Sequence, residues 1–218
     1  MNPIYRNIIS LDWMTLILGF SLLLLALGKY FFKSTFSTFF ILPFNNKYLA
    51  LSKKKGRFFN WFHLLLTLFQ LLNISLFAFL ASNVLSNKQL DSYPTIFWIA
   101  LVFILAYLAV KTLLQLGNGY FFENLKIMND LIFKKLSYFN YGGIIAFLGN
   151  IIIIYILQDS KPVVYATLFL ILLINAIGLV TILRNHQKLI VANILYFILY
   201  LCTLEISPLV IIGSYLND

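Results

Sequence analysis

Charged side chains are scarce in this sequence. Asp, Glu, Lys and Arg make up only 11% of its 218 residues, and only 7 residues are acidic. Soluble domains carry roughly 25% charged residues, so this composition excludes an ordinary soluble domain. What the sequence has instead is long apolar runs, with 61% hydrophobic residues and a mean hydropathy of +0.92. This combination predicts an integral membrane protein.

Cysteine and histidine are also rare, which limits metal and redox chemistry. The single cysteine, Cys202, lies inside an apolar run, so the chain has no intramolecular disulfide and no cysteine metal cluster. The two histidines, His63 and His186, are expected at similar depths. Two ligands without supporting cysteines or carboxylates are weak evidence for a shared haem or metal. We therefore expect no cofactor and no metal.

Catalytic motifs are missing as well. The sequence contains no phosphate-cradling glycine loop, no HExxH, no nucleophile elbow and no CxxC. We therefore expect no catalytic residues, and an enzyme ranks below the non-catalytic alternatives. The formal net charge of +9 would suggest nucleic acid for a soluble protein. In a membrane protein the basic residues of cytoplasmic loops explain it, so we expect no nucleic-acid partner.

Six apolar segments are long enough to cross a bilayer, which takes about 20 mainly apolar residues. They are Trp13–Phe32, Phe59–Asn83, Thr95–Leu116, Ser137–Leu157, Val163–Leu183 and Leu189–Tyr215. The first lacks a small-residue cleavage site, so we interpret it as a retained helix and not as a signal peptide. The sequence thus predicts one all-α membrane domain over residues 1–218, a polytopic bundle of six spans.

The distribution of basic residues predicts the orientation. With the N-terminus outside, the outer side holds only Arg6, Lys88 and Lys161 of the 16 basic residues. The inner side then holds Lys29, Lys33, Lys47, Lys53, Lys54, Lys55, Arg57, Lys111, Lys126, Lys134, Lys135, Arg184 and Lys188. Basic residues collect on the cytoplasmic side of membrane proteins. We therefore expect a multi-pass protein of the bacterial inner membrane with both termini in the periplasm.

The first inner connection, residues 31–58, is aromatic and then basic. Its basic residues are Lys53, Lys54, Lys55 and Arg57. Aromatic rings favour the headgroup zone, and clustered basic residues favour anionic lipid. We expect a loop that lies along the inner leaflet, and a specific lipid-binding site is the alternative.

The second inner connection is predicted to be an amphipathic helix over about residues 119–136. Its apolar stripe consists of Phe121, Leu125, Met128, Ile132 and Leu136. Charged residues fall on its other faces, which makes it too polar to span. This helix is expected to lie on the cytoplasmic face of the membrane, and docking of another protein is the alternative.

Several predicted spans carry polar or small residues in stripes. In the second span His63, Thr67, Gln70 and Asn73 fall within about a third of the helix circumference, which should face the bundle interior. The fourth span offers Gly142, Gly143, Gly149 and Asn150, and the fifth offers Thr167, Asn175, Gly178 and Thr181. These stripes are interpreted as interhelical hydrogen bonds and packing notches, or alternatively as a polar pathway for a small substrate or ion.

The sixth predicted span contains a carboxylate and a proline. Glu205 points away from the helix's other polar face, and Pro208 frees the Leu204 carbonyl and kinks the helix. Asp12, at the outer start of the first span, can add to this anionic corner. Three interpretations stay open: a hydrogen-bonded glutamate at a kinked helix end, a proton- or ion-handling site, and a contact with another subunit.

Three stretches of the sequence resemble a known family. They are Asp12-Trp13, Phe44-Asn45-Asn46-Lys47 and LYLCTLEISPLVI over residues 199–211. Together they are similar to an uncharacterised six-helix integral membrane family of the Bacteroidota. The last helix of that family carries a Tyr-x-Cys-x-x-Glu-x-x-Pro pattern, which corresponds here to Tyr200, Cys202, Glu205 and Pro208. The resemblance implies an inner-membrane location in that phylum and no particular activity.

Two functional hypotheses follow from the sequence. The first is a non-catalytic subunit or assembly factor of a bacterial envelope complex, partnered by the bilayer and another membrane or envelope protein. The alternative is a small ion- or proton-coupled transporter that uses Glu205 and the polar stripes. No convincing internal repeat is present, although many transporters are built from repeated halves.

Overall fold

The computed structural model describes residues 12–43, 48–49, 61–85, 95–121, 125–158 and 160–185. Several predicted site residues lie outside these ranges: Lys53, Lys54, Lys55, Arg57, His186, Tyr200, Cys202, Glu205 and Pro208. The chain forms two compact units, Met1–Gly178 and Leu179–Asp218. All of the contacts considered below lie within the first unit.

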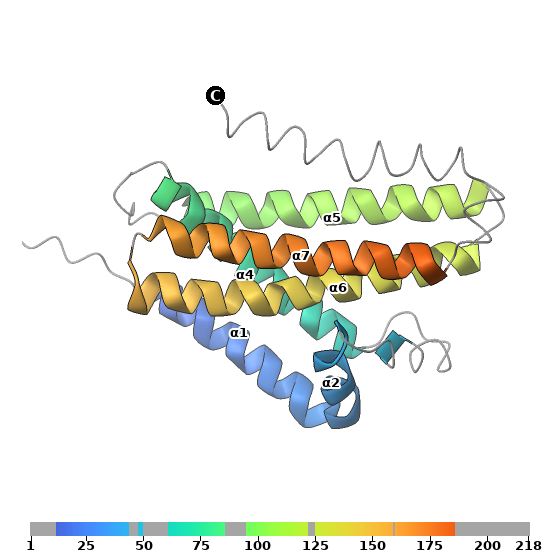
Figure 1. The fold of residues 1–218 in the computed structure, drawn as a ribbon, viewed down its shortest axis with the longest axis horizontal. Helices are drawn as coiled ribbons and strands as arrows, with labels where there is room; N and C mark the ends of the chain where they lie inside the picture. The colour runs from blue at the N-terminus through green and yellow to red at the C-terminus, as the bar shows by residue number, and fades with distance from the viewer. Residues whose placement is uncertain are drawn as a thin grey trace, which may run out of the picture. The chain divides into compact units, whose positions relative to one another are not determined.

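The described residues are all-α, as the sequence predicts. They form α1 (Asp12–Phe31), α2 (Lys33–Phe40), α4 (Trp61–Leu85), α5 (Thr95–Phe121), α6 (Leu125–Ile151), the π-helix η1 (Ile152–Ile156) and α7 (Lys161–Asn185), with no strand among them (Figure 1). Five helices are long and apolar enough to cross a membrane: Asp12–Phe31, Trp61–Leu85, Thr95–Gly117, Met128–Ile156 and Lys161–Ile182. The chain is therefore a multi-pass membrane protein. The sixth predicted span, Leu189–Tyr215, falls outside the described residues.

The composition of α4 explains why it forms a long helix and lies inside the protein. Between Trp61 and Leu85 it contains no glycine, no proline and no Asp, Glu, Lys or Arg. A bilayer leaves no water for backbone groups, so such a segment satisfies them within a helix. Among the five candidate spans α4 is the most deeply buried in the protein. It is the helix on which α1, α5 and α6 pack.

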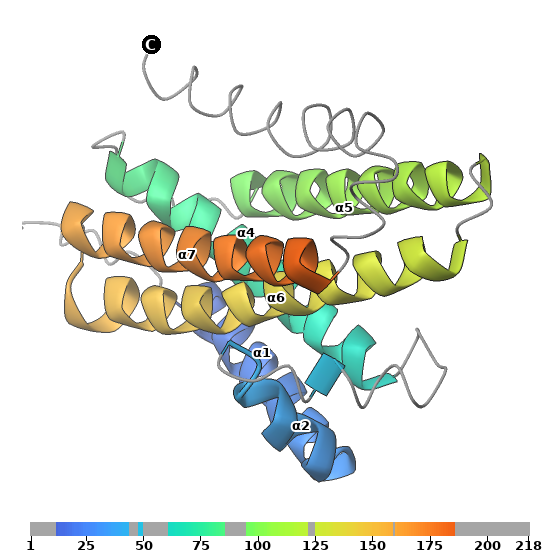
Figure 2. The same ribbon diagram turned by 45° about the vertical axis from the view of Figure 1, so that its right-hand side comes forward.

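Contacts between side chains establish the directions of the helices. Trp13 near the start of α1 meets Phe79 near the end of α4, with ring centroids 5.3 Å apart. Gly28 near the end of α1 faces Phe62 at the start of α4, so α1 and α4 are antiparallel. The helices α6 and α7 run side by side in both ribbon views, and α1 crosses them at an angle (Figures 1 and 2).

The structure differs from the sequence-based expectation in the second inner connection. There α5 continues to Phe121, and α6 begins at Leu125 and continues into the fourth predicted span. Residues 125–136 are thus the first turns of a long helix and not a separate element. The reason is local: residues 125–141 contain neither proline nor glycine, and Asp130 and Lys134 form a buried ion pair of 2.9 Å at i, i+4 spacing.

The segment that follows the C-terminal end of α6 is wound differently from α6 itself. The segment Ile152–Ile156 is a π-helix, and the Leu157 amide donates to the Ile152 carbonyl at 2.8 Å. Single π-helical turns are rare and often mark functional sites. Within this turn the Tyr155 hydroxyl lies 2.8 Å from Thr15 Oγ1 of α1. The π-helix therefore positions a polar contact between η1 and the N-terminal part of α1.

Candidate functional site

A buried row of polar side chains joins α4 to α6. We call it the polar seam and define it as His63, Thr67, Gln70 and Asn73 of α4 with Asn140, Gly143 and Asn150 of α6. Gln70, Asn73, Asn140 and Asn150 are all 0% exposed, and His63 is 5% exposed. Thr67 is partly buried. The stripe on α4 therefore faces protein and not lipid.

Two hydrogen bonds cross the seam. The amide nitrogen Nδ2 of Asn150 donates to the backbone carbonyl of Asn73 at 2.9 Å. Nearer the start of both helices, Asn140 Nδ2 lies 3.4 Å from Thr67 Oγ1. Residue numbers rise together on the two helices, which shows that α4 and α6 are parallel. These contacts are the interhelical bonds that one interpretation of the sequence expected.

Glycine allows the two helices to approach closely in the middle of the seam. A Cβ atom placed on Gly143 would lie only 2.8 Å from the Cα of Gln70. Gly142 faces the opposite neighbour, because its Cβ would lie 3.6 Å from Ile171 of α7. Similarly, a Cβ on Gly149 would overlap Thr167 at 2.6 Å. The small residues of α6 thus form notches for both α4 and α7.

The seam leaves many polar atoms without a hydrogen-bond partner among the described residues. They are His63 Nδ1 and Nε2, Gln70 Nε2 and Oε1, Asn73 Oδ1, Asn140 Oδ1 and Asn150 Oδ1. Each unpaired buried polar group costs about 1–3 kcal/mol, and most such groups in native proteins are paired. Packing alone does not explain this concentration, because apolar side chains would fill the same space at a lower cost. The seam is therefore the best candidate for a functional site.

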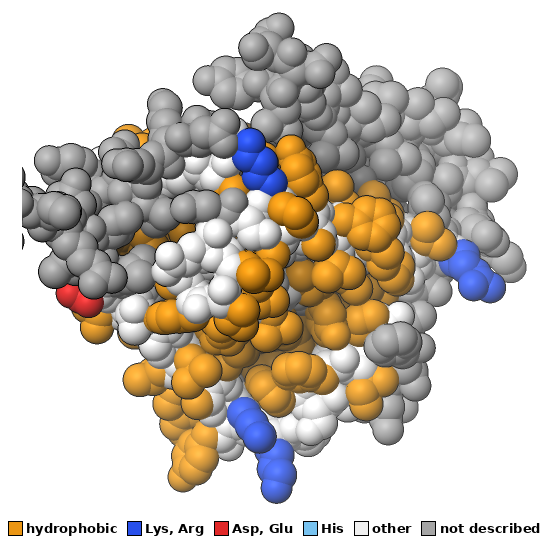
Figure 3. All heavy atoms as spheres, turned by 60° about the vertical axis from the view of Figure 1, so that its left-hand side comes forward, with side chains coloured by type: hydrophobic (Ala, Val, Ile, Leu, Met, Phe, Trp, Pro, Cys, Tyr) orange, Lys and Arg blue, Asp and Glu red, His pale blue; other side chains and the backbone are white. Residues whose placement is uncertain are grey.

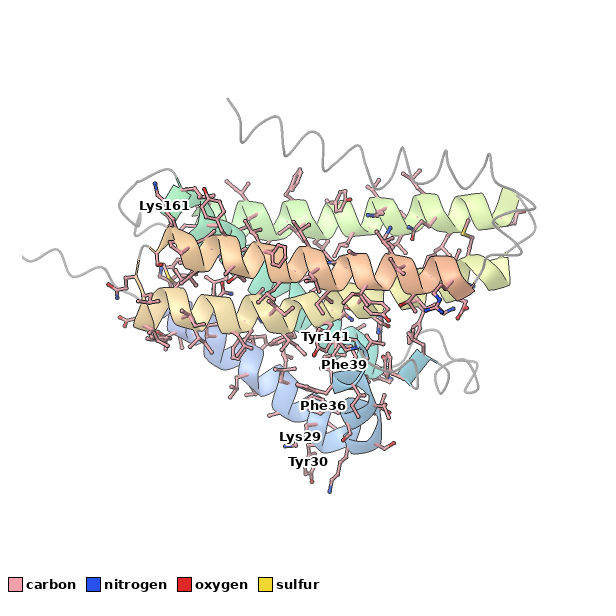
Figure 4. The ribbon with its side chains drawn as sticks, viewed as in Figure 1. Lys29, Tyr30, Phe36, Phe39, Tyr141 and Lys161 are labelled. Atoms are coloured by element: carbon pink, nitrogen blue, oxygen red, sulfur yellow. The ribbon has the colours of Figure 1, made fainter. Side chains whose placement is uncertain are left out.

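An aromatic cluster surrounds the end of the seam where His63 lies. The His63 ring is 4.9 Å from the Phe133 ring, centroid to centroid. Phe133 also stacks on Tyr48 at 5.9 Å, and Phe39 of α2 contacts Tyr48 at 5.4 Å. In Figure 4, Phe36, Phe39 and Tyr141 lie close together between α2 and α6, and Lys29 and Tyr30 lie beyond them at the end of α1.

Tyr48 attaches the segment after α2 to α6. Its side chain is 2% exposed and forms a hydrogen bond with Ser137. Ser137 in turn donates to the Phe133 carbonyl at 2.7 Å. Burial raises the pKa of the Tyr48 phenol above its ordinary value, because a phenolate loses its hydration there, and the Ser137 hydrogen bond opposes this only in part. Tyr48 is therefore a neutral anchor under physiological conditions.

The remaining predicted site residues are dispersed in the described structure. Asp12 begins α1 and is exposed. Phe121 ends α5 and Leu125 begins α6, while Met128 and Ile132 are half-buried on α6. No group of three or more His, Cys, Asp or Glu residues that could hold a metal ion occurs in this part of the chain. The predicted anionic corner around Glu205 and Pro208 lies outside the described residues.

Sequence reasoning did not identify Asn140, Tyr48 or Ser137 as site residues. A signal for Asn140 was present, because Asn140, Gly143, Phe147 and Asn150 recur at i, i+3, i+7 and i+10 on one face of α6. Tyr48 carries no comparable signal. It follows a short helix in a connection, and only the folding of that connection onto α6 brings it to Ser137.

The family described as Domain of unknown function (DUF4271) matches residues 14–216. The match includes the whole polar seam and the last predicted span. No curated protein and no solved structure matches the chain.

Proposed function

The chain belongs to the DUF4271 family of unknown function, and from its own residues we propose a small proton- or ion-coupled membrane transporter that uses the polar seam. The observation that carries the proposal is the row of buried, unpaired amide and imidazole groups between α4 and α6. Polar groups inside a membrane are costly and are commonly part of a pathway for ions or substrates.

The dimensions of the seam suit a pathway. His63 and Asn73 are ten residues apart, which corresponds to about 15 Å along a helix, or half of a bilayer core of roughly 30 Å. Toward the outer side we propose that Glu205 of the sixth predicted span supplies the coupling carboxylate. Asp12, Tyr200, Cys202 and Pro208 are proposed to line the same outer corner.

Location and orientation form part of this proposal. We place the protein in the inner membrane of a bacterium of the Bacteroidota, with both termini in the periplasm. The described basic residues support this orientation. This topology assigns three helix ends with basic residues to the cytoplasm: the last turn of α1 with Lys29, the first part of α6 with Lys134 and the last turn of α7 with Arg184. Lys161 begins α7, and the topology assigns it to the opposite side.

The first part of α6 is proposed to extend the spanning helix to the cytoplasmic leaflet. Met128 and Ile132 belong to its apolar stripe and are half-buried, so each retains exposed apolar surface. Together with Phe121 and Leu125, these residues would contact lipid or a partner protein. The basic residues Lys53, Lys54, Lys55 and Arg57 of the preceding inner connection are proposed to contact anionic headgroups on the same side.

The test is proton flux in vesicles that contain the purified protein. An imposed membrane potential should drive proton uptake that Glu205→Gln abolishes and that Gln70→Leu reduces, because one removes the coupling carboxylate and the other the middle of the seam. Gly19→Ala is the matched control, because Gly19 lies on α1 with nothing within 4 Å of an added Cβ. Flux equal to that of empty vesicles, or flux unchanged by Glu205→Gln, would contradict the proposal.

A second candidate is a non-catalytic subunit or assembly factor of an envelope complex. The extent of exposed apolar side chains favours it. On α5 and α7 these include Trp98, Phe103, Leu113, Tyr165 and Phe169, each more than half exposed. In Figure 3 the described side chains on one face of the protein are mainly hydrophobic, with Lys and Arg at few places. Lipid or a partner subunit would cover such a surface.

Purification from native membranes in a mild detergent separates the two candidates. A subunit is expected to retain a stoichiometric partner, identified by mass spectrometry, and Glu205→Ala should release it. A transporter is expected to purify without a partner. Recovery of a single species from both the unmodified protein and Glu205→Ala would count against the subunit hypothesis.

A further inference from the structure

The three asparagines of the polar seam are oriented by their own hydrogen bonds. Asn73 Nδ2 donates to the Phe69 carbonyl at 2.8 Å, and Asn150 Nδ2 donates to the Asn73 carbonyl at 2.9 Å. A backbone carbonyl only accepts hydrogen bonds, so the amide nitrogen of each asparagine must face it. The amide oxygen of each side chain then faces the other way.

The orientation of the Asn140 side chain follows from the hydrogen bond that its partner, Thr67, already makes. Its partner, Thr67 Oγ1, already uses its hydrogen to reach the His63 carbonyl at 2.9 Å. Thr67 therefore offers Asn140 only a lone pair, and Asn140 must donate with Nδ2. Consequently all three asparagines leave Oδ1 as a buried acceptor, and none of these oxygens has a donor among the described residues.

Acceptors outnumber donors along the seam. The three asparagine oxygens and Gln70 Oε1 need donors, and His63 adds an acceptor nitrogen when its ring is neutral. Against them, the seam offers the two N–H groups of the Gln70 amide, one N–H of His63 and the second N–H of each asparagine amide. Because each amide oxygen has two lone pairs, acceptor positions still outnumber donors. These groups therefore suit a ligand that donates hydrogen bonds and can also accept some.

The acceptor oxygens of the seam form a row along the helices and not a ring around one point. Thr67 pairs with Asn140, Gln70 lies against Gly143, and Asn73 pairs with Asn150, so the oxygens occupy successive levels along the two helices. A metal cation gathers several oxygens around one point, as in the carbonyl rings of ion-selective filters. Within the described residues, moreover, α4 carries no carboxylate to compensate a buried positive charge.

We infer that the polar seam binds a file of water molecules, whose O–H groups donate to Oδ1 of Asn73, Asn140 and Asn150 and extend to Gln70 and His63. Buried water typically makes about three hydrogen bonds to otherwise unsatisfied polar groups, which matches this row of acceptors. The inference rests on the seam proposed above as the transport site and names its ligand. Such a file suits the transfer of protons or neutral hydrogen-bonding solutes, and not of Na⁺ or K⁺.

Water-edited solid-state NMR of the unmodified protein in lipid vesicles tests this inference. Magnetisation transferred from water should reach the side-chain amides of Asn73, Asn140 and Asn150 several-fold faster than the methyl groups of Leu76 and Leu80, which are 0% and 1% exposed. Equal build-up at the seam amides and at these leucines would overturn the inference. Exposed Asp12 provides the reference for full contact with water.

Substitution provides a second measurement that does not depend on transport. Asn140→Leu should slow the transfer of magnetisation from water to the Gln70 amide, because it removes one acceptor of the file. Asn175→Leu is the matched control: its amide bonds to the Ile171 carbonyl of its own helix at 2.8 Å and lies outside the seam. An unchanged transfer to Gln70 in Asn140→Leu, with the protein folded, would also overturn the inference.

The result is separable from the transport proposal. Fast transfer to the seam amides without proton flux would uphold the water file and remove the transporter. Proton flux with a dry seam would overturn the water file and move the pathway to another part of the protein.

Discussion

At the scale of single residues, glycine decides how closely the helices of the seam approach. Gly143 brings the α6 backbone against the backbone of Gln70 in the middle of the seam. Gly19 occupies a similar helix interior in α1 but has nothing within 4 Å of an added Cβ. Replacing glycine by alanine should therefore change the stability of the protein in opposite directions at Gly143 and at Gly19.

Gly143→Ala should destabilise the protein by about 1–3 kcal/mol, because its Cβ forces α4 and α6 apart. Gly19→Ala should stabilise it by roughly 0.5–1 kcal/mol, since alanine favours a helix over glycine. Thermal unfolding in detergent, followed by loss of the folded species on size-exclusion chromatography, measures both. Equal behaviour of the two variants would refute the close approach of α4 and α6 at Gly143.

At the scale of elements, the connection after α1 folds back onto the start of α4 and α6. Phe36 and Phe39 of α2 contact Phe62, with ring centroids 6.4 Å and 6.0 Å apart. Tyr48 completes this packing against Phe133 and Ser137. The described part of this connection, residues 32–43 and 48–49, therefore packs against the bundle. Its position along the inner leaflet stays a prediction.

Tyr48→Phe should cost about 0.5–1.5 kcal/mol at neutral pH, because it removes one buried hydrogen bond. This difference in the free energy of unfolding should decrease at alkaline pH. Burial raises the folded-state pKa of Tyr48 above 10.0, so its contribution is intact below pH 10.0 and is lost as the pH rises and the unfolded phenol ionises. The stability gap between the two proteins should therefore narrow above pH 10.0.

Thermal unfolding of both proteins at neutral pH and above pH 10 measures this gap. Tyr30→Phe is the control, because Tyr30 is 81% exposed at the end of α1. This substitution should leave the thermal stability close to that of the unmodified protein at both pH values. A gap that stays constant across the alkaline range would mean that Tyr48 is not held in a buried, neutral state.

At the scale of the whole molecule, the described helices alternate in direction as a multi-pass topology requires. Contacts between side chains make α1 antiparallel to α4, and α4 parallel to α6. Pairing of Gly149 with Thr167, and of Gly178 with Tyr138, makes α6 antiparallel to α7. Lys33 and Lys161 should therefore lie on opposite sides of the membrane.

Single cysteines introduced at these positions test the topology. The test uses a Cys202→Ser background and cells with a permeabilised outer membrane and an intact inner membrane. In these cells Lys161→Cys should react with a maleimide that cannot cross the inner membrane. Lys33→Cys should react only after the inner membrane is permeabilised. The reverse pattern would invert the proposed orientation, and labelling of both cysteines in intact cells would place both positions on the outer side.

The sequence by itself determined that this is an all-α, multi-pass protein, because spanning a bilayer imposes a local requirement: about 20 apolar residues that satisfy their own backbone. The starts of the five described spans agree with the hydropathy pattern within a few residues, except for α6. There the pattern could not show that polar residues 125–136 continue the same helix, since hydropathy reports affinity for lipid and not helix continuity.

Only the tertiary structure decided which polar faces meet. The sequence marked the stripe of His63, Thr67, Gln70 and Asn73 on one side of a helix, but several helices offered a matching face. The close fit at Gly143 and the bond from Asn150 to Asn73 select α6. Such pairings depend on the shapes of two surfaces far apart in the chain. For the same reason the aromatic packing around Tyr48 emerges only when the connection has folded back.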